Sequence, residues 1–143
     1  PFAMLQIKDP LGTSFELEST PKRIISLVPS LTETLYDLGL EEKIIGITKF
    51  CTHPFHFKST KKIIGGTKKV HYEKIRLLQP DFIIANKEEN TEEMVVELRK
   101  ICPVWVQYYN YRRRISDHYR FWTTLQLSDR STKMDRQDCF WLC

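Results

Sequence analysis

The segment Arg23-Ile24-Ile25-Ser26-Leu27-Val28-Pro29-Ser30 decides the fold class. Four of the five residues from Ile24 to Val28 are apolar, and they occupy both alternating faces of the run. A strand that is apolar on both faces is typical of a parallel sheet covered by helices. Pro29 ends this strand, and Ser30 followed by Glu33 predicts an N-cap and capping box for a helix.

The same alternation of apolar runs and helical patterns continues along the chain. Further strands are expected at residues 43–48, 81–86 and 103–106, a short strand or loop at 62–66, and helices at 30–38, 71–79 and 91–100. Residues 49–62 are expected to form one long polar loop. Strands separated by helices predict an α/β fold: a parallel sheet flanked by helices, with right-handed crossovers. A β-hairpin at residues 5–18 is expected to precede it, because turn residues separate two alternating runs.

Composition and charge fit a folded chain with one core. The 143 residues carry a formal charge of +4, and 41% of them are hydrophobic, which argues against disorder. Apolar runs such as Phe82–Ala85 are far shorter than the roughly 20 residues of a membrane span. Four scattered cysteines do not suggest a disulfide framework. Residues 1–4 lack the start of a secretory signal, so we expect no signal peptide in this chain.

The composition changes near residue 107. Residues 1–106 contain 12 Lys, 3 Arg and every Glu, Gly and Pro, whereas residues 107–143 contain 1 Lys, 6 Arg and 8 of the 17 aromatic residues. We therefore predict a domain at 1–106 and a poorly ordered tail at 107–143. An out-of-register reading of the gene could produce this switch, and we hypothesise that a frameshift truncates the chain from about Gln107. A genuine divergent tail is the alternative, and resequencing the gene would decide between them.

Three stretches follow the carboxyl ends of predicted strands, namely Pro29-Ser30, residues 49–57 and residues 86–90. In open parallel sheets, ligands bind outside these ends. Long loops in compact domains are also often functional. We therefore expect the three stretches to line one common rim.

The ordered series of segments resembles the substrate-binding proteins of iron-siderophore and cobalamin ABC importers. The resemblance covers about residues 15–106 and is carried by residues 20–30, 45–48, 72–75 and 79–85. It implies two α/β lobes joined by a long rigid helix, with the ligand in the cleft between them. Residues 1–106 would be the N-terminal lobe.

The resemblance implies a non-enzymatic binding component without a resident cofactor or metal. Its ligand would be cobalamin or an iron complex such as a siderophore or haem, and its partner would be an ABC permease in the membrane. If exported, the protein would lie in the periplasm or on the outer side of the inner membrane. Because one lobe supplies one wall of the cleft, we expect weak or absent binding by this chain.

The resemblance and the rim position together give a set of candidate ligand-binding residues. Pro29 and Ser30 lie at a helix start, where backbone N–H groups favour an acceptor, although plain capping by Ser30 is an alternative. Phe50 offers an aromatic face, although it could equally pack beneath its loop. The predicted ligand-binding residues are Pro29, Ser30, Phe50, Cys51, His53, Thr67, Asn86 and Glu88.

Glu73 has a different implied role, in docking to the permease. In cobalamin-binding members of the family, a glutamate of this helix contacts arginines of the permease. A carboxylate that meets arginine forms a charge-assisted contact. The alternative is an ordinary surface carboxylate.

Two further hypotheses concern other residues. Cys51, His53 and His56 could bind a transition metal or serve a small α/β enzyme, although a structural zinc site usually needs four ligands. The Tyr108–Arg114 run mixes aromatic residues with arginine, as nucleic-acid-binding or membrane-binding segments do. The modest net charge and the lack of a recognised fold there lead us to expect no nucleic-acid partner.

Overall fold

The computed structural model describes residues 5–9, 11–17 and 21–107 in two separate compact units. The first contains the hairpin of β1 (Leu5–Lys8) and β2 (Ser14–Leu17), which pair antiparallel as predicted. Asp9 organises the turn, because its Oδ1 accepts hydrogen bonds from Leu11 N at 3.0 Å and Thr13 N at 2.9 Å. From residue 108 onward, the predicted tail at 107–143 lies outside the described residues.

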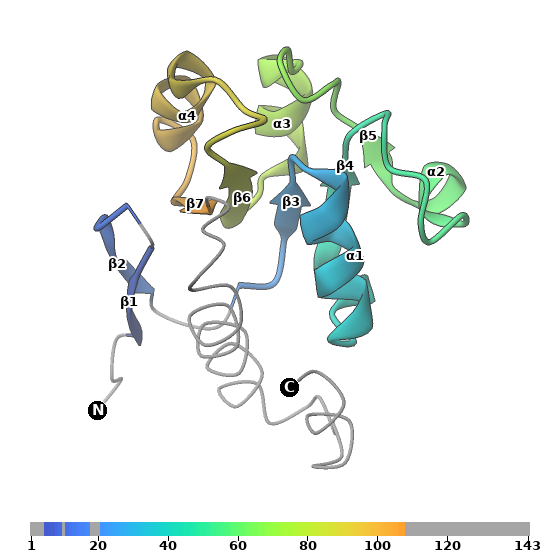
Figure 1. Cartoon of the computed structure of the whole chain (residues 1–143), viewed down its shortest axis with the longest axis horizontal. Helices are drawn as coiled ribbons and strands as arrows, with labels where there is room; N and C mark the ends of the chain where they lie inside the picture. The colour runs from blue at the N-terminus through green and yellow to red at the C-terminus, as the bar shows by residue number, and fades with distance from the viewer. Residues whose placement is uncertain (1–4, 10, 18–20, 108–143) are drawn as a thin grey trace. The chain divides into compact units, whose positions relative to one another are not determined.

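The second unit is built on a five-stranded parallel sheet (Figure 1). Its strands are β3 (Ile24–Ser26), β4 (Ile44–Ile47), β5 (Lys62–Ile63), β6 (Phe82–Asn86) and β7 (Val104–Gln107). The spatial order is β5-β4-β3-β6-β7, so the chain reverses its direction of travel across the sheet between β5 and β6. The predicted parallel α/β sheet is confirmed.

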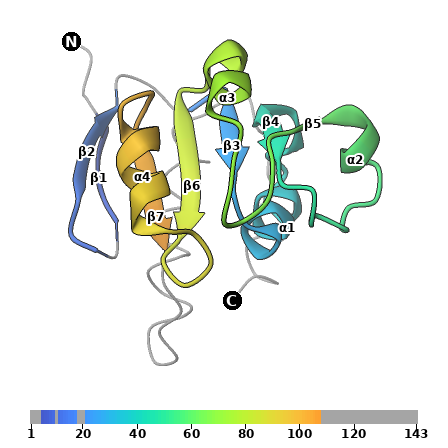
Figure 2. The ribbon, with the colours of Figure 1, turned by 90° about the horizontal axis from the view of Figure 1, so that it is seen from above.

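Helices cover both faces of this sheet. The longer ones are α1 (Pro29–Asp37), α3 (Tyr72–Leu78) and α4 (Glu92–Arg99); α2 (Phe57–Thr60) and the 3-10 turn η1 (Glu41–Lys43) are short. The crossover through α1 runs from β3 to β4, whereas the crossovers through α3 and α4 run in the opposite direction across the sheet, towards β7. Because all of them are right-handed, α1 lies on one face of the sheet and α3 and α4 lie on the other (Figures 1 and 2). The core combines strand residues, with β6 buried at every position, and helix residues such as Leu35, Ile75 and Leu98.

Two helix ends agree with the predicted helix ranges 30–38 and 91–100. Thr91 is the N-cap of α4, and its Oγ1 accepts a hydrogen bond from Met94 N at 3.2 Å. Gly39 follows α1 with φ +78°, a left-handed conformation that favours glycine, and its N–H donates to Tyr36 O.

Two local predictions are wrong. Ser30 is not the N-cap of α1, because Pro29 already occupies the first turn and Val28 is the extended cap residue without a side-chain bond. The Thr32 hydroxyl, whose donor contacts are Ser26 Oγ at 2.8 Å and Val28 O at 3.1 Å, ties the first turn of α1 to the end of β3. Residues 49–62 are not one loop, since α2 forms around the buried Phe57.

Candidate functional site

The carboxyl ends of β3, β4, β5 and β6 lie along one edge of the sheet, towards which the arrowheads of β3 and β6 point in Figure 2. The reversal of strand order between β5 and β6 makes this edge a topological switch point, where α/β sheets bind ligands. We call the loops on this edge the rim: residues 27–30, 48–57, 64–70 and 87–91.

Buried Asn90 joins three loops of the rim. Its Nδ2 donates to Thr67 O at 2.8 Å and to Leu27 O at 3.4 Å, while its Oδ1 accepts from Asn86 N at 2.8 Å. Asn86, also buried, accepts from the N–H groups of Glu88 at 2.8 Å and Glu89 at 3.1 Å. The ends of β3 and β6 and the loop after β5 are therefore held in one arrangement by neutral amides.

Phe50 presents an aromatic ring on the rim. Its side chain is 53% exposed, and Lys49 Nζ lies 5.1 Å from the ring centroid. The ring also packs close to Gly66, where an added Cβ would come within 3.1 Å of Phe50 Cε2. Lys49 N donates to Gly65 O at 2.8 Å, which fixes the loop carrying Phe50 beside the loop after β5.

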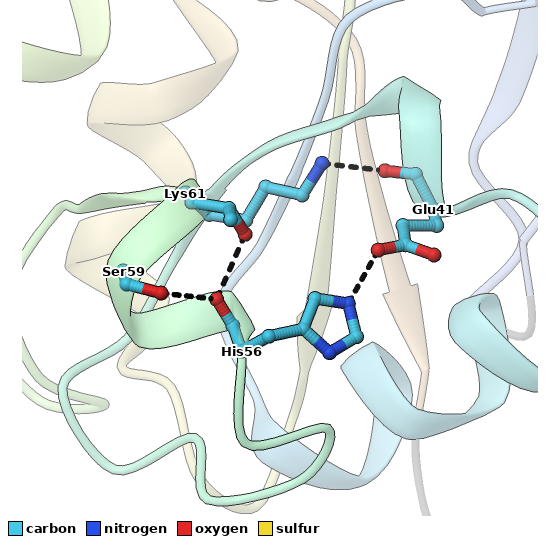
Figure 3. A network of polar contacts seen from close by, with 5 residues as sticks. Glu41, His56, Ser59 and Lys61 are labelled. Carbon is cyan, nitrogen blue, oxygen red and sulfur yellow. Dashed lines mark hydrogen bonds and ion pairs between the residues drawn. The ribbon is translucent and has the colours of Figure 1, made fainter.

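The residues from Cys51 to His56 do not converge on a common point. Cys51 is buried, and its thiol donates to His53 O at 3.5 Å. His56 instead contacts the Glu41 carboxylate, and Lys61 Nζ donates to Glu41 O at 2.7 Å (Figure 3). Among the described residues, no group of three or more His, Cys, Asp or Glu side chains is placed to hold a metal, so the geometry gives the metal-binding alternative no support.

The contacts of His56 belong to the packing of α2. Ser59 Oγ donates to His56 O at 2.9 Å (Figure 3), and Thr60 Oγ1 donates to the same oxygen at 2.9 Å. The Tyr36 ring meets His56 and Phe57 edge to face, with centroid separations of 5.9 and 5.6 Å. These contacts fasten the short helix to α1 and η1.

The eight predicted ligand-binding residues occupy different depths of the rim. Ser30, Phe50, His53 and Glu88 are exposed, Pro29 and Thr67 are half-buried, and Cys51 and Asn86 are buried. The structure thus places all eight on the carboxyl edge, while only the first six have side chains that reach the surface. Their role in ligand binding stays a prediction. Sequence reasoning missed Asn90, which was visible only as one more polar residue of a loop.

Glu73 lies in the first turn of α3, exposed, with its carboxylate paired to Arg76 one turn later. Leu77, on the same helix, is 82% exposed. The outer face of α3 therefore presents an acidic, a basic and an apolar side chain together.

The two buried thiols of the described residues lie at opposite edges of the sheet. Burial and, to a lesser extent, the nearby Asp81 carboxylate together raise the pKa of Cys102, before β7, to about 12. Burial also raises the pKa of Cys51, after β4, although the hydrogen bond to the His53 backbone opposes this. Both thiols are therefore protonated at neutral pH and are poor nucleophiles or metal ligands.

A parallel α/β unit with an ordered rim at its switch point belongs to the class of α/β folds that bind ligands at the carboxyl ends of their strands. A family model described as "Periplasmic binding protein" matches residues 24–121. The chain belongs to this family, which consists of binding proteins and not of enzymes.

Individual relatives agree with this assignment. The chain is 37% identical over 81 residues to "Uncharacterized ABC transporter substrate-binding lipoprotein YvrC" of Bacillus subtilis, covering 57% of this chain and 25% of that protein. It is 38% identical over 73 residues to a "Vitamin B12-binding protein" of Vibrio vulnificus, covering 50% of this chain and 26% of the relative. The chain thus spans about a quarter of the length of these two relatives.

A solved structure supports the fold. The iron uptake ABC transporter substrate-binding protein PiuA from Streptococcus pneumoniae superimposes with a TM-score of 0.74 at 24% identity, covering 99% of this chain and 48% of PiuA. At this identity the likeness concerns the fold.

Proposed function

We propose that the chain forms one wall of a binding site for cobalamin or an iron complex in an ABC import system. The observation that carries the proposal is the rim: loops from four strands meet at the switch point, and the buried Asn90 amide joins three of them. The vitamin B12-binding name of one relative supports cobalamin, and an iron complex is the other ligand class that the family resemblance implies.

The ligand contacts follow from the positions on the rim. Phe50 would lie against a flat part of the ligand, and the exposed Ser30 and the backbone around Thr67 would meet its polar groups. Cys51 and Asn86, which are buried, would hold the loops in place without contacting the ligand. Because tight binding requires most of the ligand surface to be buried, one wall gives an affinity in the micromolar range or weaker.

Titrations of ¹⁵N-labelled protein with cyanocobalamin, zinc protoporphyrin and a gallium(III) siderophore, the last two as diamagnetic substitutes for haem and the ferric complex, test this function. The expected result is weak binding of at least one of them, with the largest amide shifts at residues 50, 66 and 88. A lack of amide shifts at the rim with all three ligands would reject the function. Submicromolar affinity for any of them would reject the view that these residues form a single wall.

We further propose that the face of α3 around Glu73 contacts the membrane permease. Its carboxylate is exposed and lies one turn from Leu77, so an arginine and an apolar residue of a partner could meet the two together. Within the described residues no helix is long and apolar enough to cross a bilayer. We propose that the protein acts on the outer side of the cytoplasmic membrane, as the lipoprotein and periplasmic names of its relatives and family suggest.

Pull-down of a cobalamin or iron-siderophore permease complex with Glu73→Gln and Glu42→Gln variants tests the docking role. Glu42, an exposed carboxylate of η1, serves as the control. Loss of capture with Glu73→Gln alone is expected. Equal capture by both variants would contradict the role of Glu73.

A further inference from the structure

We propose that a second copy of this chain docks on the rim, so that two rims face each other across a two-fold axis and the partner supplies the opposite wall of the ligand site. The part of the dimer in ligand binding rests on the proposed function, whereas the docking itself rests on the rim alone. Two observations carry it. The charges of the rim are separated by sign into two ends, and exposed aromatic rings lie at one of these ends.

One end of the rim is positively charged. It consists of the loops after β4 and β5, residues 48–57 and 64–70, and we call it the basic end. These loops contain no Asp or Glu and carry three exposed lysines, Lys49, Lys68 and Lys69. Backbone hydrogen bonds hold the two loops side by side, from Lys49 N to Gly65 O at 2.8 Å and from Gly66 N to Lys69 O at 2.8 Å. The three positive charges therefore belong to one surface.

The other end of the rim is negatively charged. It consists of the loop after β6 and the first turn of α4, residues 87–93, and we call it the acidic end. Four carboxylates stand there against one lysine: Glu88, Glu89, Glu92 and Glu93 against Lys87. The loop is held in place because Asn86 Oδ1 accepts from Glu88 N at 2.8 Å and Glu89 N at 3.1 Å. The excess of three negative charges at this end equals the excess of three positive charges at the basic end.

The strand order separates the two ends in space. Because the sheet runs β5-β4-β3-β6-β7, the basic end lies on one side of β3 and the acidic end lies on the other (Figure 2). The ends meet at Lys68, whose Nζ donates to Glu88 O at 3.2 Å. A two-fold axis between the ends places the basic end of each copy over the acidic end of the other, so the rim is complementary to itself. Opposite charges then face each other twice, which favours this arrangement over arrangements that bring like charges together.

Two aromatic rings supply the apolar part of the contact. Phe50 is 53% exposed and Phe55 is 85% exposed, and both lie in the loop after β4. Docking of a second copy removes apolar surface of these rings from water, and aromatic residues are enriched at the centres of interfaces between proteins. A ligand held between two rims is covered from both sides, which one wall cannot achieve.

Sedimentation velocity of the whole chain, measured over a range of protein concentrations, tests the docking. At an ionic strength of about 0.01 M, where the screening length is about 30 Å, we expect reversible dimers whose fraction rises with protein concentration. At about 1 M salt, where the screening length is about 3 Å, the dimer should be at least about tenfold weaker. A chain that stays monomeric at about 1 mM in low salt, or a dimer that salt does not weaken, would overturn the proposal.

Charge reversal at each end provides a more specific test. Lys49→Glu with Lys69→Glu makes both ends acidic, and Glu89→Lys with Glu92→Lys makes both ends basic. Each variant alone should dimerise at least about tenfold more weakly, because like charges now face each other. An equimolar mixture of the two variants should dimerise again, with one copy of each in the pair. A folding defect cannot produce this recovery, and its absence would reject the rim-to-rim arrangement.

Lys22→Glu with Arg99→Glu is the matched control. It reverses two exposed charges outside both ends of the rim, one before β3 and one in the last turn of α4. This variant should dimerise as strongly as the unmodified chain, and an equally weakened dimer would show that the charge effect does not come from the rim. Phe55→Ser should also weaken the dimer, whereas an unchanged dimer would contradict burial of this ring in the contact.

Ligand addition separates this inference from the proposed function. Cyanocobalamin, zinc protoporphyrin and the gallium(III) siderophore are added at a fixed protein concentration, and any of them that shifts the rim amides should raise the dimer fraction. A ligand that shifts the rim amides while the chain stays monomeric overturns the second copy, and the binding function stands. Dimers that form although no ligand shifts the rim amides or raises the dimer fraction overturn the binding function, and the docking stands.

Discussion

The backbone groups at the amino ends of the strands (the amino edge) and at their carboxyl ends (the carboxyl edge) are hydrogen-bonded by different kinds of side chain. At the amino edge, the exposed Asp81 carboxylate accepts from Lys22 N at 2.8 Å and Arg23 N at 2.9 Å, and Arg23 Nε donates to Leu78 O at 3.0 Å. At the carboxyl edge, the side chains that accept hydrogen bonds from the backbone are the buried, neutral Asn86 and Asn90. Charged side chains exposed to water hold the amino edge, whereas buried neutral amides hold the rim.

The largest expected effect concerns the buried thiols at the two edges. Because the pKa of Cys102 is raised to about 12, its thiolate fraction at pH 8 is about a thousandfold below that of an ordinary thiol. Cys51 should also react slowly in the native protein. Iodoacetamide labelling with peptide mapping measures both, and labelling as fast as in urea would contradict the buried positions.

The raised pKa of Cys102 also has a consequence for stability. Above pH 9 the unfolded chain releases this proton and the folded chain retains it, so the free energy of unfolding falls as the pH rises from about 9 towards 12. The contribution is fully present below pH 9. Cys102→Ala should flatten this alkaline slope in urea titrations, whereas an unchanged slope would exclude the thiol as its source.

Replacing Asn90 tests whether amides hold the rim. Asn90→Ala removes two donors and one acceptor and leaves the buried carbonyls of Leu27 and Thr67 without this partner. We expect a loss of about 2–4 kcal/mol in the free energy of unfolding, measured by urea denaturation. A loss below about 1 kcal/mol would mean that the loops are held by other contacts.

Replacing Asp81 provides the corresponding test at the amino edge. Asp81→Ala removes the acceptor for two backbone N–H groups, but these groups are exposed and can bond to water instead. We therefore expect a smaller loss of about 1–2 kcal/mol. Asp81→Asn, which keeps one acceptor oxygen, should fall between the wild type and the alanine variant. A loss as large as that for Asn90 would remove the contrast between the edges.

The smallest effect is expected at Glu41, where an exposed ion pair fastens α2. Glu41→Gln removes the charge that contacts His56 while the Glu41 carbonyl still accepts from Lys61. Exposed pairs contribute about 0–1 kcal/mol, so the melting temperature should hardly change. A marked drop would show that this pair is as important as the amides of the rim.

The sequence predicted the features that depend on neighbouring residues. The apolar runs predicted the parallel strands, and the helical pattern from Thr91 predicted the start of α4, because each pattern depends only on residues within one turn or one strand. The cap at Ser30 was wrong because Pro29 and Thr32 offer a competing local arrangement. The role of Asn90 could not be predicted, since its partners Thr67 and Leu27 lie 23 and 63 residues away.

The order of the strands also sets a sequence for folding. β3, β4 and β5 are consecutive neighbours, so residues 24–63 can pair as they leave the ribosome. The other neighbour of β3 is β6, and Ile24 pairs with Phe82. Closing the long loop between these two residues costs more conformational entropy than a local pairing. We expect the pairing of β3 with β6 to form last, so that the rim is complete only after nearly the whole lobe has been synthesised.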